Sequence, residues 1–215
     1  MAEPARNFEQ PHDRNARLYA LGLDEATVEE IALYGLRARQ AVSPFAPPSF
    51  PGTTQWAETN VGARLLLVPK GWKADDTKNF SRIVSPSGKV AIFVATGDEH
   101  TGIATAEPRT KHPKGAETEA AVEKNAQAQL PGLALASENA QVAETWAFLL
   151  CANDLEMRYE VSRPKKQDSE GRVTTWSDRI IFPPIDLESL PARDDDGGGD
   201  DEDDDRGIDV PVERI

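Results

Sequence analysis

Residues 80–96 read FSRIVSPSGKVAIFVAT, two strand-like runs on either side of Pro86-Ser87-Gly88. Proline and glycine favour a tight turn, so Phe80 to Ser85 and Lys89 to Thr96 are predicted to form a β-hairpin. The second run is apolar at successive positions, which is typical of a strand whose sheet is covered on both faces. We therefore predict a sheet with a central, buried strand at 89–96.

A second hairpin is predicted downstream. Residues 144–152 and 155–163 flank Asn153-Asp154, a pair that tolerates the positive φ of a tight turn. In the second of these strands, alternate positions are apolar and the intervening ones are charged. We interpret the charged row, Glu156, Arg158 and Glu160, as a solvated sheet face on which the charges compensate one another. A last strand is predicted over 172–182.

One substantial helix is predicted between these hairpins, over residues 115–130, and Pro131-Gly132 ends it. Consecutive hairpins indicate antiparallel pairing. The predicted fold class is therefore α+β: a twisted, mainly antiparallel sheet packed on one helix and preceded by an N-terminal helical hairpin.

The rest of the chain divides by composition. We predict a flexible arm at 1–12 and a helical hairpin at 13–42, in which Gly22 joins the two helices and Asp24 caps the second. A proline-rich connector is expected at 43–59. The α+β domain then spans 60–190 and begins with a strand-like apolar run from Ala63 to Val68. A disordered acidic tail is expected at 191–215.

The tail contains nine acidic side chains between Asp194 and Asp205, a large part of the formal net charge of −13. Such crowded like charges repel one another and offer no apolar face to bury, so disorder is predicted. We expect a non-enzymatic adaptor or accessory protein whose tail contacts a protein partner with a basic surface, in nucleic-acid-handling machinery. The predicted partner-binding residues are Asp203, Asp204, Asp205, Ile208, Val210, Val212 and Ile215.

The order of acidic and then apolar residues in this tail resembles the acidic tip of bacterial single-stranded-DNA-binding proteins. That resemblance implies docking of the last residues into a basic-rimmed pocket. The alternation of Ile208, Val210 and Val212 also resembles SUMO-interacting motifs, which implies addition of a strand to a partner's sheet.

Composition excludes several other classes. No run approaches the roughly 20 apolar residues of a membrane helix, and the first ten residues lack the apolar core of a secretory signal. The single cysteine, Cys151, cannot form an internal disulfide and is interpreted as a small buried apolar residue. We expect a cytoplasmic protein with no cofactor, no metal and no contact with membranes.

Two alternative functions stay open. The first is a hydrolytic enzyme with acid–base groups in the loop 97–102, where Asp98, Glu99 and His100 follow the buried strand. The second is direct binding of nucleic acid or another anion through basic loops at 109–114 and 163–172. The residues predicted for that role are Arg109, Lys111, Lys114, Arg163, Lys165 and Lys166.

Overall fold

Strand β4 (Val90–Thr96) is an interior strand of a mixed, eight-stranded sheet. The structure, a computed structural model, describes residues 4–127 and 143–188. The strands follow the order β1-β7-β6-β5-β4-β3-β2, and β8 pairs with β6. The other strands are β1 (Arg6–Phe8), β2 (Lys73–Asp75), β3 (Arg82–Val84), β5 (Glu144–Ala152), β6 (Glu156–Gln167), β7 (Val173–Ile181) and β8 (Ile185–Asp186).

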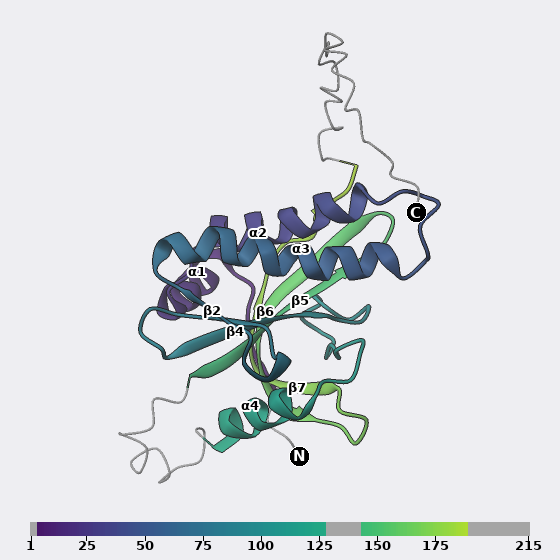
Figure 1. The fold of residues 1–215 in the computed structure, drawn as a ribbon. Coiled ribbons are helices and arrows are strands. Elements are labelled where there is room, and N and C mark those ends of the chain that lie inside the picture. Colours follow the sequence, from purple (N-terminus) through teal and green to yellow (C-terminus); the bar gives the residue numbers. More distant parts are fainter. Residues whose placement is uncertain (1–3, 128–142, 189–215) are drawn as a thin grey trace, which may run out of the picture.

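Helices cover both faces of this sheet (Figure 1). Three helices pack on one face: α1 (Pro11–Leu21), α2 (Glu25–Gln40) and α3 (Phe50–Leu67). The fourth, α4 (Ala116–Gln127), packs on the other. Successive side chains of β4 point to opposite faces of the sheet. Ile92 and Val94 therefore join the core under α1–α3, and Phe93 and Ala95 join the core under α4. The result is a three-layer arrangement.

Local sequence explains how the first helices begin and meet. Asp24 accepts a hydrogen bond from the Thr27 amide at 2.8 Å, as an N-cap does, and so starts α2. Gly35 then allows α2 to approach α3 closely, since a Cβ at this position would lie 2.0 Å from Thr59 Oγ1. Helices α2 and α3 therefore form one closely packed pair.

Both predicted hairpins are confirmed. Strands β3 and β4 pair antiparallel around the turn at Pro86-Ser87-Gly88, and β5 and β6 pair antiparallel around Asn153-Asp154. The predicted strand at 172–182 corresponds to β7. The α+β class fits four helices and this mixed sheet.

The expectation for residues 43–68 is wrong in its second half. Residues 50–59 were expected in an extended connector and Ala63 to Val68 in a strand, but Phe50–Leu67 is one helix. Pro51 is compatible with this helix because it lies in the first turn, where its missing amide hydrogen costs nothing. The apolar run is helical because Ala63 and Leu67, four residues apart, face the core while Leu65 is exposed.

Three further expectations are corrected. Residues 6–8 of the predicted flexible arm form β1, which pairs in parallel with β7. Strands β4 and β5 are also parallel, because α4 lies in the connection between them and returns the chain to the same edge. The helices predicted at 13–42 belong to the same core as the sheet of the α+β domain, since Leu18 and Ile31 share one core with Trp146.

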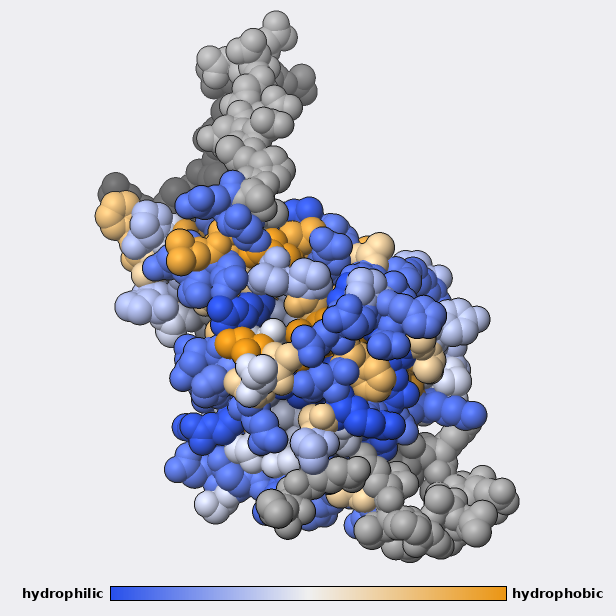
Figure 2. Space-filling view, turned by 180° about the vertical axis from the view of Figure 1, so that it is seen from behind, coloured by the Kyte–Doolittle hydropathy of each residue, from blue (hydrophilic) through white to orange (hydrophobic). Residues whose placement is uncertain are grey.

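The predicted helix beyond Gln127 and the predicted acidic tail lie outside the described residues. Within those residues, no helix is both long and apolar enough to span a bilayer. Seen from behind, side chains of hydrophilic residues cover most of the described surface (Figure 2).

Candidate anion-binding site

A cleft lies at the carboxyl ends of the parallel strands β4 and β5. Thr96 and Gly97 form the end of β4, and Cys151 and Ala152 the end of β5. In sheets with parallel strands, ligands bind in the crevice outside the carboxyl ends. The cleft has a volume of about 530 Å³, within the range of roughly 300–1,000 Å³ that is usual for ligand clefts.

Helices α2 and α3 form one wall of this cleft. Arg39 comes from the last turn of α2, and Ser49, Gly52 and Thr53 come from the start of α3. Trp56, one turn further along α3, donates a hydrogen bond from Nε1 to the Val94 carbonyl at 3.0 Å. This bond fixes the indole ring, and the side chain remains 41% exposed. The wall thus presents hydroxyl groups and one held aromatic surface.

The basic loop 109–114 forms another part of the cleft wall, and backbone hydrogen bonds hold it in place. The Lys111 amide donates to the Thr96 carbonyl at 2.8 Å, and the Lys114 amide donates to the Gly171 carbonyl at 2.8 Å. Gly171 has φ +79°, and a Cβ there would lie 3.2 Å from the Lys114 carbonyl oxygen. A glycine in the β6–β7 turn therefore allows the close approach that places Lys114 in the cleft.

Three cations line the cleft, and the described residues give them no counter-ion. Arg39, Lys111 and Lys114 line it, and none of them forms an ion pair with a residue in 4–127 or 143–188. Burial lowers the pKa of Lys114, since a partly buried ammonium group loses hydration and no carboxylate compensates it. Charges arranged in this way favour an anion in the cleft.

Cys151 also lines the cleft, which the sequence did not indicate. Burial raises the pKa of its thiol, and the negative charge of Asp98 raises it further. The thiol therefore stays protonated at neutral pH and contributes surface to the cleft. The prediction of a small buried residue holds only in part, because the side chain is half-buried at the cleft wall.

The predicted catalytic residues lie beside the cleft but do not line it. His100 Nδ1 is 3.6 Å from Asp98 Oδ2, and Arg109 Nε is 3.9 Å from the same oxygen. The Glu99 carbonyl accepts a hydrogen bond from Arg158 at 3.2 Å. The hydrolytic role of Asp98, Glu99 and His100 stays a prediction to which the cleft adds no support.

The two basic loops lie against each other, but their charged side chains differ in burial, in ion pairing and in whether they line the cleft. Thr110 N donates to the Val173 carbonyl at 3.0 Å, so loop 109–114 lies against the β6–β7 turn. Arg163 is nevertheless buried and pairs with Glu144 at 3.3 Å. Lys165 is half-buried and Lys166 exposed, and neither lines the cleft. Of the six cations predicted for anion binding, only Lys111 and Lys114 line it.

The interpretation of Glu160 as part of a solvated face is wrong. Its side chain is fully buried and accepts hydrogen bonds from Arg179 on β7 and from the Gly102 amide. Arg179 also donates to the Ile103 and Ala106 carbonyls. The loop after β4 covers this side of the sheet, which periodicity alone could not indicate. The pair holds that loop beside the cleft.

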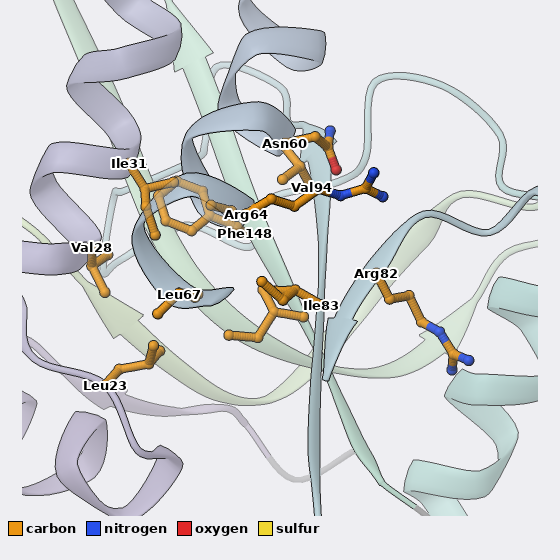
Figure 3. Close-up of a pocket in the computed structure, with 12 residues that line it drawn as sticks. Leu23, Val28, Ile31, Asn60, Arg64, Leu67, Arg82, Ile83, Val94 and Phe148 are labelled. Carbon is orange, nitrogen blue, oxygen red and sulfur yellow. The ribbon is translucent and has the colours of Figure 1, made fainter. Parts of the chain in front are cut away.

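Two other cavities lack the features of a site. The cavity in Figure 3 measures about 20 Å³, room for little more than a water molecule, and Val28, Ile31 and Phe148 are among the apolar side chains around it. A cavity of about 360 Å³ lies between α4 and β3, but the charged groups Asp75 and Arg82 in its wall pair with each other. In that wall, Lys124 is the one cation without an ion pair among the described residues, whereas three such cations line the cleft.

No group of three or more His, Cys, Asp or Glu residues able to hold a metal occurs in the described parts of the chain. The cleft residues missed by sequence reasoning include Arg39, Ser49, Trp56 and Cys151. Residues 90–152 contain a strand, a helix and a parallel strand. This order of elements is a signal for a ligand site at the carboxyl ends of β4 and β5. No family model, curated protein or solved structure matches this chain.

Proposed function

We propose that the protein binds a small phosphate ester in the cleft at the ends of β4 and β5, without catalysing a reaction on it. The observation that carries this proposal is the convergence of Arg39, Lys111 and Lys114 on one cavity with no counter-ion among the described residues. Arg39 and Lys114 are half-buried, while Lys111 is exposed. A partly buried cation without a counter-ion is costly, and a bound anion removes that cost.

The surroundings of these cations favour a phosphate ester over a simple inorganic anion. The start of α3 offers the hydroxyl groups of Ser49 and Thr53 together with the positive end of a helix of 18 residues. Trp56 offers an immobilised aromatic surface on which a planar group can stack. The cleft therefore has complementary places for a phosphate and for an attached ring.

Calorimetric titration of the full chain tests this proposal with three probes: inorganic phosphate, AMP and a single-stranded oligonucleotide. We expect AMP to bind more tightly than phosphate, and the double variant Lys111→Met/Lys114→Met to weaken AMP binding at least tenfold. Lys89→Met is the matched control, because Lys89 is exposed at the opposite end of β4. Absence of AMP binding would overturn the proposal.

The same titration distinguishes phosphate-ester binding from the alternative of nucleic-acid binding. If the oligonucleotide binds far more tightly than AMP, with an affinity that falls steeply with salt, the basic loops contact a nucleic-acid backbone instead. The adaptor function through the tail stays a prediction, since residues 191–215 lie outside the described part of the chain.

A further inference from the structure

The described chain ends beside the cleft. Strand β8 pairs with the start of β6, and the Leu187 amide donates to the Leu155 carbonyl at 2.9 Å. Leu155 follows the turn after Ala152, which lines the cleft. In Figure 1, the yellow end of the described chain lies at the same end of the molecule as the connection between α2 and α3. The next residues of the sequence therefore start close to the β5–β6 turn, which directly follows Ala152 in the cleft wall.

The sequence that follows this point is strongly acidic. Five residues, Ser189 to Arg193, separate Glu188 from the acidic segment, defined here as Asp194 to Asp205 with its nine carboxylates. A chain spans at most about 3.3–3.6 Å per residue. The first carboxylate of the segment can thus lie up to roughly 20 Å from Glu188, and the later ones can reach further.

The segment and the cleft are also complementary in charge. The cleft contributes Arg39, Lys111 and Lys114, which have no ion-pair partner among the described residues. The sequence between Asp194 and Asp205 contains no cation that could neutralise its carboxylates locally. A short tether gives such a segment an effective concentration on the order of millimolar, so even weak electrostatic affinity leads to substantial occupancy.

We propose that the acidic segment Asp194–Asp205 docks in the cationic cleft of its own chain. Carboxylates of the segment then replace the missing counter-ions of Lys111, Lys114 and Arg39. The docking itself needs only the cleft. Its consequence, competition with a phosphate ester, rests on the proposed function. An external ligand must displace the segment, which lowers its apparent affinity by the fraction of molecules in which the cleft is free.

Zero-length carbodiimide cross-linking of the full chain tests the docking directly, because it joins a lysine amine to a carboxylate only in direct contact. Arg193 and Arg206 flank the segment, so trypsin releases it as one peptide that mass spectrometry can assign. In dilute solution we expect cross-links to Lys111 and Lys114 within one chain, and few to the exposed Lys89. Links spread evenly over all lysines, or found only between two chains, would overturn the proposal.

A second measurement tests competition. In a variant with all nine acidic residues of the segment changed to Asn or Gln, chain length is kept and only charge is removed. We expect this variant to bind AMP about three- to tenfold more tightly than the wild type at low salt, with the difference shrinking as salt screens the contact. Equal affinities at low salt would contradict competition.

The two proposals fail separately. If neither protein binds AMP but cross-links still concentrate on Lys111 and Lys114, the proposed function is wrong and the docking stands. If AMP binds both proteins equally and the cross-links do not concentrate, the docking is wrong and the proposed function stands.

Discussion

Glu160 on β6 and Arg179 on β7 form a buried ion pair, with Arg179 Nη2 2.6 Å from Glu160 Oε2. Both side chains are almost completely excluded from solvent. The Ser162 hydroxyl donates to Glu160 Oε1 at 2.7 Å, and Arg179 Nη1 donates to the Ala106 carbonyl at 2.6 Å. Every charged group in this network is satisfied, so the pair anchors the loop after β4 to the sheet.

Removing one member of this pair is expected to be costly. Arg179→Met leaves Glu160 buried without its counter-ion, and we expect a loss of about 3–5 kcal/mol in the free energy of unfolding. Urea denaturation measures this loss. Arg158→Met, in the partly exposed pair with Glu156, is the control and should cost less than about 1 kcal/mol. Similar losses in both variants would show that Glu160 is not buried as described.

The close contact between α2 and α3 at Gly35 leads to a second prediction, on stability. Gly35→Ala places a methyl group 2.0 Å from Thr59 Oγ1 and 2.8 Å from the Gln55 carbonyl oxygen. Since backbone cannot move aside cheaply, we expect a loss of about 1–3 kcal/mol in stability by thermal or chemical denaturation. Gly52→Ala is the matched control in α3, because nothing lies within 4 Å of its added Cβ. That substitution should leave stability unchanged or raise it by up to about 1 kcal/mol.

Lys114 is expected to lower the free energy of unfolding while it contributes to anion binding in the cleft. At pH 7, Lys114→Met removes a partly buried ammonium group whose pKa burial lowers, so we expect the free energy of unfolding to rise by about 0.5–2 kcal/mol while AMP binding weakens. The penalty is present while Lys114 is protonated. The stability advantage of the variant should therefore decline as the pH rises through the lowered pKa of Lys114. Denaturation between pH 7 and 10 measures this, and a destabilised variant would contradict it.

Trp56 offers a spectroscopic test of the cleft. The protein has four tryptophans, and Trp72, Trp146 and Trp176 are buried while Trp56 is 41% exposed. Acrylamide should therefore quench chiefly the fluorescence of Trp56. We expect AMP to reduce this quenching and inorganic phosphate to change it little, because only AMP carries a ring that covers the indole. Trp56→Leu should abolish the quenchable fraction and weaken AMP binding more than phosphate binding.

Asp75 is expected to make the free energy of unfolding depend on pH in the acid range. Hydrogen bonds from the Thr77 side chain and amide, together with Arg82, lower the pKa of Asp75 from 3.8 to about 2. A lowered pKa adds stability that is present above pH 3.8 and is lost as the pH falls towards 2. Asp75→Asn should therefore reduce stability at pH 7 by about 1 kcal/mol, since the group is partly exposed, and the difference should vanish near pH 2. A difference that persists at pH 2 would contradict this.

The hairpins were predictable because their signals are local. Pro86-Ser87-Gly88 and Asn153-Asp154 place turns between runs of strand residues, and no distant residue is needed to interpret them. Helix α3 was missed because the prolines near its start are typical of a connector and the short apolar run at its end can also be read as a strand. Ala, Arg and Leu are strong helix formers, so propensity and the core contacts of Ala63 and Leu67 both favour the helix there.

Sequence by itself determined the strands of both hairpins, the helix cap at Asp24 and the concentration of negative charge between Asp194 and Asp205. These depend on neighbours a few residues apart. Only the tertiary structure decided that β4 and β5 run parallel and that Arg39, Lys111 and Lys114 converge on one cavity. Whether a charge is paired, buried or available depends on which distant segments lie beside it, and the packing of the sheet between its helices places those segments together.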